Sequence, residues 1–242
     1  MTLLIGAGFL ILTIIFFYLL MRLFRPVMPP KAFRNTVIAL IAWMIFLAAW
    51  SFSGMATQFD RFPVNMAPVL MIPMLTIVII TFLPATKRAL ARIEPKSIVN
   101  LQVFRVFVEL LLWACFVQNL LPEQMTFEGR NWDIISGLTA PLAAIFLVRS
   151  KWGLALWNIM CLALLVNIVT VAILSMPTPL RVFFNEPSNT IVAYFPFILL
   201  PGMLVPLAYG LSFLSLRQIF LLHLRNEETP TIAARSGSVQ HN

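Results

Sequence analysis

Seven long apolar stretches most constrain what this chain can fold into. A helix that crosses a membrane needs roughly 20 mostly apolar residues, and seven segments come close to that length. Of the 242 residues, 60% are hydrophobic and 11% are charged, whereas soluble domains carry about 45–50% apolar and about 25% charged residues. A water-soluble fold could not cover so much apolar surface, so we expect an integral membrane protein. The predicted spans are residues 3–21, 37–53, 66–82, 98–121, 132–148, 152–176 and 191–216.

The apolar stretches are continuous, which favours helices over strands. A membrane β-barrel would show segments of about ten residues with alternating polarity, and the sequence has none. We therefore predict an all-α fold, a polytopic membrane bundle of seven transmembrane helices in residues 1–216. The first stretch has no basic residues before it and no small-residue cleavage site, so we interpret it as a retained helix rather than a signal peptide.

The basic residues are distributed unevenly along the chain. Cytoplasmic loops of membrane proteins carry an excess of Lys and Arg, so the basic side predicts an N-terminus outside and a C-terminus in the cytoplasm. The same distribution accounts for the net charge of +8, with some attraction to anionic lipid, and we expect no nucleic-acid partner. Thirteen of the 17 Lys and Arg residues follow the first, third, fifth and seventh stretches: Arg22, Arg25, Lys31, Arg34, Lys87, Arg88, Arg92, Lys96, Arg149, Lys151, Arg217, Arg225 and Arg235.

Residues 217–242 form the expected cytoplasmic tail. The first part of the tail continues the seventh helix or lies on the membrane surface. From Asn226 on the composition is polar and includes Pro230 and Gly237. Polar segments with few large apolar residues cannot offset the entropy cost of folding, so we expect most of the tail to be disordered.

The stretch 98–121 carries the clearest candidate for a central polar site. Arg105 and Glu109 are four residues apart, so they project from nearly the same helix face, and Gln102 lies one turn earlier on it. Each charge costs roughly 2.5–3.5 kcal/mol at a helix centre, so this face should point into the bundle. Asn158, at a similar depth in the sixth stretch, is the predicted partner. The residues form either a functional site or an ion pair within one helix that only holds helices together.

The seventh stretch contains candidates for a hinge or a cavity lining, namely Tyr194, Pro201, Pro206 and Tyr209. A proline inside a helix removes a hydrogen bond and frees a carbonyl one turn earlier. Such carbonyls line cavities in transporters with broken helices. The alternative is a kinked helix whose prolines serve only packing.

The connection before the fifth stretch is dense in charge. Its Glu123, Glu128 and Arg130 are candidates for an outer mouth, with a solvated turn as the alternative. Asn131 is predicted to cap the following helix, and Asp133 to face the positive end of that helix.

Residues 122–133, PEQMTFEGRNWD, together with GLTAP at 137–141, resemble a family of uncharacterised bacterial seven-helix membrane proteins. The resemblance extends over most of the chain and is sharp only at this motif. It implies the fold and a location in the bacterial cytoplasmic (inner) membrane, and it implies no chemistry.

Several familiar membrane chemistries are excluded by the residues that the spans lack. No predicted span contains Lys or His, so the chain has no retinal Schiff-base lysine and no pair of haem-binding histidines. The sequence has no HExxH zinc motif and no phosphate-binding loop. Cys115 and Cys161 are the only cysteines, and both fall in apolar stretches. We therefore expect no metal and no cofactor.

Three functions remain. The first is a small-solute transporter or channel-like protein with its central site on the fourth stretch, acting on a small molecule or ion within the lipid bilayer. The second is a receptor or scaffold without catalysis. The third is a metal-independent intramembrane enzyme acting on a lipid-like substrate, and the residues favour a protein that is not an enzyme. Substrate, ion coupling and oligomeric state are not determined by the sequence.

Overall fold

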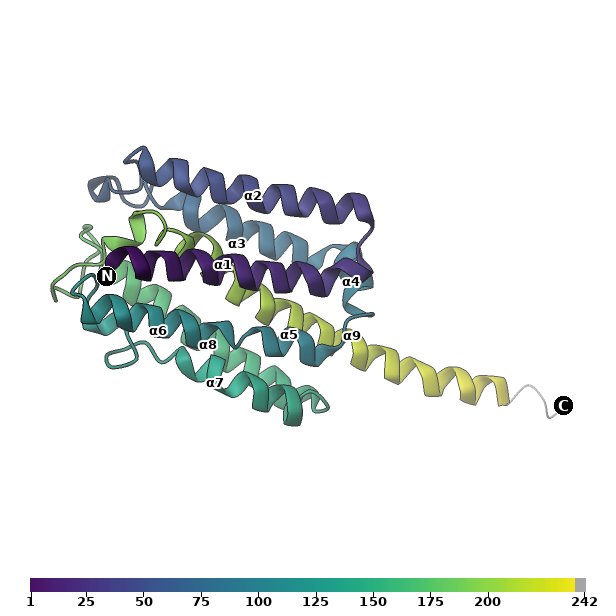
Figure 1. The fold of residues 1–242 in the computed structure, drawn as a ribbon. Coiled ribbons are helices and arrows are strands. Elements are labelled where there is room, and N and C mark those ends of the chain that lie inside the picture. The colour runs from purple at the N-terminus through teal and green to yellow at the C-terminus, as the bar shows by residue number, and fades with distance from the viewer. Residues whose placement is uncertain (238–242) are drawn as a thin grey trace.

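The chain folds into a bundle of roughly parallel and antiparallel helices (Figure 1). The computed structural model describes the backbone of residues 1–237 and the side chains of residues 1–221, and it has no strand in that part. The all-α prediction is therefore confirmed. The helices are α1 (Thr2–Phe24), α2 (Pro30–Phe52), α3 (Ala67–Phe82), α4 (Pro84–Leu90), α5 (Pro95–Leu101), α6 (Phe104–Val117), α7 (Ile134–Leu142), the π-helical η4 (Ala143–Leu147), α8 (Lys151–Leu174), the π-helical η6 (Leu200–Leu204) and α9 (Val205–Gly237).

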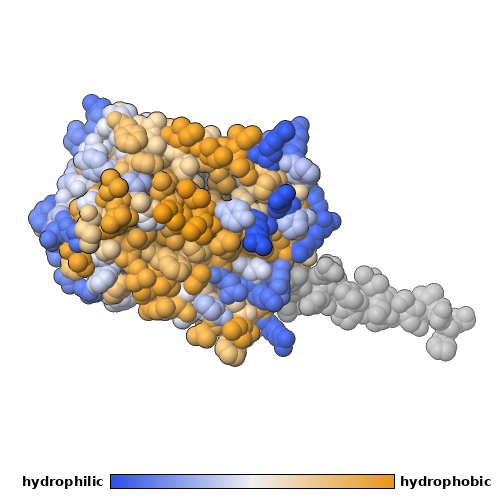
Figure 2. Space-filling view, viewed as in Figure 1, coloured by the Kyte–Doolittle hydropathy of each residue, from blue (hydrophilic) through white to orange (hydrophobic). Residues whose placement is uncertain are grey.

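Seven helical segments fall, in order, on the seven predicted stretches. Five are long and apolar enough to cross a membrane, and a sixth crossing results if α3 and α4, bent by 69°, count as one. The seventh, Ile134–Leu147, is shorter. Figure 2 shows an apolar belt between two hydrophilic ends, as a bilayer requires. The helices are those of a membrane protein, whereas the number of spans and their orientation stay predictions. The five long helices are Thr2–Val27, Pro30–Phe52, Pro95–Val117, Lys151–Leu174 and Leu200–Leu221.

Proline explains two of the breaks. Leu83 has extended backbone angles, φ −62° and ψ 143°, because the ring of Pro84 disfavours helical angles in the residue before it. The chain therefore bends there between α3 and α4. In the seventh stretch the helix begins at Leu200, later than the predicted residue 191. Residues 191–199 form a 3-10 turn and irregular structure instead, since Pro196 cannot donate to a helical ladder.

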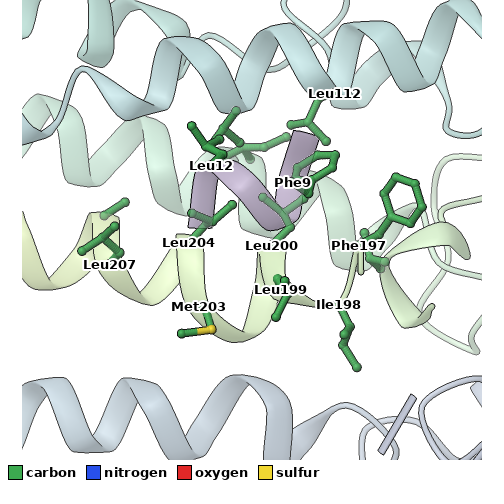
Figure 3. Close-up of a cluster of buried hydrophobic side chains, with 14 of the residues drawn as sticks. Phe9, Leu12, Leu112, Phe197, Ile198, Leu199, Leu200, Met203, Leu204 and Leu207 are labelled. Atoms are coloured by element: carbon green, nitrogen blue, oxygen red, sulfur yellow. The ribbon is translucent and has the colours of Figure 1, made fainter. Parts of the chain in front are cut away.

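The start of α9 lies at the centre of the bundle. It packs against α3, α5 and α8, while α1 packs on α6 and α6 packs on α7. Figure 3 shows the apolar contacts there, where Phe9 and Leu12 of α1 and Leu112 of α6 meet the segment from Phe197 to Leu207. The disorder predicted for the tail concerns mostly residues 222–242, whose side chains lie outside the described residues, and it stays a prediction.

Candidate functional site

Arg105 is buried at the start of α6, and every nitrogen of its guanidinium has an acceptor. Its Nε donates to Oδ2 of Asp133 at 2.7 Å, and its Nη2 donates to Oδ1 of the same carboxylate. Its Nη1 donates to Oε1 of Gln102 at 3.0 Å, and Nη2 also donates to the carbonyl of Cys161 at 3.1 Å. The side chains of Arg105 and Asp133 are only 1% and 6% exposed. The pair is closed, and four of the five guanidinium N–H groups are used.

This pairing corrects the expectation of an ion pair within one helix. In the described part of the chain Arg105 forms its ion pair with Asp133, not with Glu109. Asp133 precedes the first residue of α7 and was expected to face the positive end of that helix. Its carboxylate instead accepts from Arg105 and from Oγ of Ser136, the latter at 3.3 Å, and it caps no backbone N–H of the helix. A full guanidinium charge binds a carboxylate more strongly than the partial charge of a helix end does.

Glu109 is 2% exposed and has a single polar partner. Nδ2 of Asn131 donates to its Oε2 at 2.5 Å, and the same amide donates to the carbonyl of Met125 at 3.1 Å. No ion pair joins Glu109 to any Lys or Arg of the described residues. Asn131 also accepts the backbone N–H of Asp133 at 3.1 Å. Asp133 is the residue before the first turn of α7, and no side chain caps that helix, so the predicted capping role of Asn131 is wrong.

Asp133, the partner of Arg105, and Asn131, the partner of Glu109, both belong to the connection between α6 and α7. This connection folds into the bundle. Gln124, Met125 and Asn131 are buried. Nε2 of Gln124 donates to Oγ of Ser175 at 3.0 Å. A Cβ on Gly129 would meet the backbone of the preceding turn, so only glycine allows the chain to close on itself there. The connection is therefore a plug that positions polar groups beside α6, rather than a surface turn.

The candidates for an outer mouth lie on the exposed side of this plug. Glu123, Glu128 and Arg130 are all exposed. Oε1 of Glu128 accepts from Nε1 of Trp113 at 2.7 Å, and the backbone carbonyl of Arg130 accepts from Nδ2 of Asn167 at 2.8 Å. These bonds attach the plug to α6 and α8. Whether the three residues also form a mouth stays a prediction.

A cavity of about 70 Å³ lies next to the polar cluster. A buried water needs roughly 10–15 Å³ of such space, so the cavity has room for a few waters or one small molecule. Its polar lining is Arg105, Glu109, Asp133 and Asn189. The side-chain oxygen of Asn189 is buried and has no partner among the described residues. Since every nitrogen of Arg105 already donates to a partner, the wall offers mainly acceptors.

The remaining lining of the cavity is apolar. The residues on its partly exposed side come from α3, α8 and α9, so the cavity is bounded outward by side chains that suit lipid rather than water. Pro201, in the π-helical η6, also lines it. The partly exposed lining residues are Leu70, Val169, Ala172, Ile173 and Val205.

The other hinge candidates lie away from the cavity lining. Tyr194 is 50% exposed at the end of the bundle, and Tyr209 packs against Phe213. Pro206 lacks the N–H that would bond the carbonyl of Gly202, and Nε1 of Trp43 donates to that carbonyl instead, at 2.8 Å. The freed carbonyl therefore joins α2 to η6. Whether the four residues form a hinge stays a prediction.

Of the other candidate residues, Gln102 joins the cluster and Asn158 does not. Oε1 of Gln102 accepts from Arg105 and lies 3.5 Å from Oγ of Ser212. Asn158 donates to the carbonyl of Leu154 at 2.9 Å and to Oγ of Ser215 at 3.0 Å, so its described hydrogen bonds join α8 to α9. The predicted bond to Arg105 is not among them. It is the backbone carbonyl of Cys161, one turn along α8, that accepts from Arg105.

The polar cluster lies entirely within a segment that matches a known protein family. A domain of unknown function, DUF8737, matches residues 61–220, roughly two thirds of the chain. The chain belongs to the DUF8737 family. The match to DUF8737 begins ahead of α3 and takes in the plug, the cavity and most of the described part of α9, whereas α1 and α2 precede it.

No curated protein and no solved structure matches the chain. The expected membership of an uncharacterised family is therefore confirmed. The bacterial origin and the seven-helix character of that family stay predictions.

Proposed function

We propose that this DUF8737 protein is an integral membrane protein that binds a small solute beside Glu109 and passes it through the bundle, as a transporter or channel-like protein. The observation that supports the proposal is the cavity wall, where Glu109 has one amide partner and no ion pair among the described residues. A buried carboxylate without a cation is costly, and ionisable groups inside membranes mark substrate or ion pathways by default.

The chemistry of the cavity limits what the solute can be. Asp133 balances the charge of Arg105, and four of its five guanidinium N–H groups already donate within the cluster, so the cavity offers little to hold an anion. The groups left on the wall, the carboxylate of Glu109 and the side-chain oxygen of Asn189, are acceptors. A small molecule with a positive or hydrogen-bond-donating end and a short apolar remainder fits this wall.

The elements around the cavity support movement of a solute. Pro201 lies on the cavity wall within a π-helical turn, and such turns are frequent at functional sites. Helices interrupted at mid-membrane by irregular backbone are typical of transporter binding sites. In this proposal the segment before α9 is the part that rearranges when solute enters or leaves.

The alternative of a receptor or scaffold has one observation in its favour. The ion pair between Arg105 and Asp133 is closed and holds α6, α7 and α8 together, which is what a purely structural role requires. The enzyme hypothesis gains nothing comparable, because the cavity lining contains no Ser, Cys or His next to Glu109. A location in the bacterial inner membrane, with the N-terminus outside, belongs to the same proposal.

The test compares Glu109→Gln with the wild type in proteoliposomes. Glutamine keeps an oxygen for Asn131 and removes only the charge, and Glu123→Gln is the matched control because Glu123 is exposed on the same plug. Small primary amines and small carboxylates are screened by thermal shift, followed by uptake. We expect amines to raise the melting temperature and to enter with the wild type and the control, and to do neither with Glu109→Gln.

Two results would contradict the proposal. If no amine shifts the wild type, or if Glu109→Gln responds as the wild type does, the cavity is not a solute site and the scaffold alternative is favoured. The orientation has its own test: a C-terminal reporter that is active on the external side of the membrane would overturn the N-out arrangement.

A further inference from the structure

A second hollow lies between α3 and α9, at the end of the bundle where α3 bends into α4. It is a groove of about 400 Å³, within the range of about 300–1,000 Å³ that is usual for small-molecule sites. It shares no lining residue with the cavity beside Glu109. Two of its lining residues are polar, Thr81 and Arg217. The full lining is Val78, Thr81, Phe82, Phe213, Leu216, Arg217, Phe220 and Leu221.

Arg217 brings a positive charge that forms no ion pair with an acid of residues 1–221. Its Nη1 donates to the carbonyl of Leu83 at 3.1 Å and its Nη2 to that of Phe82 at 3.3 Å. These carbonyls lie at the end of α3, and that of Leu83 also accepts the backbone N–H of Lys87 at 3.2 Å. Carbonyls are neutral, and Arg217 is in no ion pair of the described residues. A guanidinium has five N–H donors, so further donors remain for a ligand.

Thr81 adds a second unsatisfied group. It is 3% exposed, lines the groove, and its Oγ1 has no hydrogen-bond partner among the described residues. Five other helical threonines, Thr13, Thr36, Thr76, Thr139 and Thr170, each donate to the carbonyl four residues earlier. Thr76, one turn earlier in α3, donates to the carbonyl of Ile72 at 2.7 Å, as serine and threonine commonly do in helices. The hydroxyl of Thr81 is a buried donor without an acceptor among the described residues.

The segments that form the groove carry positive charge, and the first acid after α4, Glu94, is paired with Lys96. Lys87 and Arg88 are exposed on α4, directly after the bend. Neither the segment 78–92 nor the segment 205–225 contains Asp or Glu. The walls themselves are aromatic and aliphatic, and Phe82 is 73% exposed. An occupant must therefore combine an apolar chain with a negatively charged head that accepts hydrogen bonds.

We propose that this groove binds an anionic phospholipid, with an acyl chain along the apolar walls and the phosphate at Arg217 and the Thr81 hydroxyl. The phosphate oxygens accept hydrogen bonds from both residues, and the negative charge of the phosphate balances the positive charge of Arg217. Clusters of Lys and Arg next to a membrane helix attract anionic lipids, by about 1 kcal/mol per basic residue near the surface. The groove adds to that attraction a fixed position for one lipid at the bend between α3 and α4.

Lipid retention tests the proposal. The full chain is purified from mixed phosphatidylglycerol and phosphatidylcholine, and the lipids that stay bound are counted by native mass spectrometry. We expect the wild type to favour phosphatidylglycerol and Arg217→Gln to reduce that preference about fivefold, which is the loss of about 1 kcal/mol. Arg25→Gln is the control, because Arg25 is exposed at the same end of the bundle and lines no described groove.

A second variant covers the case in which Arg217→Gln fails to fold after losing its bonds to the end of α3. Val78→Trp fills the groove and leaves those bonds intact, and it should also abolish the preference. Retention of phosphatidylglycerol by Val78→Trp at the wild-type ratio, or no preference in the wild type, would overturn the proposal. So would an equal loss in Arg25→Gln, since attraction would then come from the overall charge of this end.

Discussion

The buried ion pair offers the strongest test of the structure through Asp133→Asn. Asparagine preserves the shape of the side chain and one acceptor for Arg105, but it removes the negative charge. The two side chains are 1% and 6% exposed, so Arg105 would stay buried without a counter-ion. Removing one partner of a buried pair costs about 3–5 kcal/mol. The retained acceptor, with Gln102 and the Cys161 carbonyl still in place, places the loss near the lower figure, about 3 kcal/mol.

The measurement is thermal unfolding in nanodiscs. For chains of this size about 1 kcal/mol corresponds to a change in Tm of about 2–4 °C, so Asp133→Asn should lower the Tm by about 6–12 °C. Asp60→Asn, an exposed acid in the connection before α3, should leave the Tm unchanged. Replacing both partners, as in Arg105→Met with Asp133→Leu, should recover most of the loss because no charge is then left buried.

The comparison of single and double variants tests whether Arg105 and Asp133 form a coupled buried ion pair. If Asp133→Asn unfolds at the temperature of the wild type, Arg105 has another counter-ion or is hydrated, and the closed pair does not exist. If the double variant is as unstable as the sum of the single ones, the two side chains are not coupled.

Two further predictions concern bonds away from the cluster. Trp43→Phe should destabilise by about 1–3 kcal/mol in nanodisc unfolding, because the carbonyl of Gly202 loses its donor; adding Pro206→Ala restores a backbone N–H and should recover part of that loss. The pKa of Glu186, an exposed acid, is lowered by hydrogen bonds from Arg181 and from a backbone N–H. Arg181→Gln should raise that pKa in an NMR titration, and the stabilising effect of the pair should be lost as the pH falls through it.

The sequence predicts the helices well because hydropathy is a local property. Each predicted stretch overlaps one of the seven helical segments, and the burial of Arg105 and Glu109 follows from their cost in lipid. The predicted helix boundaries are wrong where proline interrupts the helix, as in the residues before Leu200. Irregular backbone is allowed within a span only when neighbouring groups form hydrogen bonds with its free N–H and C=O groups. That condition depends on other helices and is not visible in the stretch itself.

The partner of Arg105 is harder to predict. Spacing within one helix favours Glu109, yet Asp133 forms the pair, because the connection between α6 and α7 folds inward instead of staying at the surface. One signal was present: Asp133 and Glu109 are the only acids within the predicted spans. Polar composition made the connection resemble a solvated turn, and only packing distinguishes a plug from a turn.

The position of Asp133 has a consequence for how the chain enters the membrane. The segment Pro95–Val117 carries Arg105 and Glu109, which cost roughly 2.5–3.5 kcal/mol each at a helix centre. Their neutralising and hydrogen-bonding partners, Asp133 and Asn131, are synthesised afterwards. We expect that α6 does not insert stably among lipids until the plug and α7 have been synthesised. We therefore expect the three to insert together, and a chain truncated before residue 131 to insert α6 poorly.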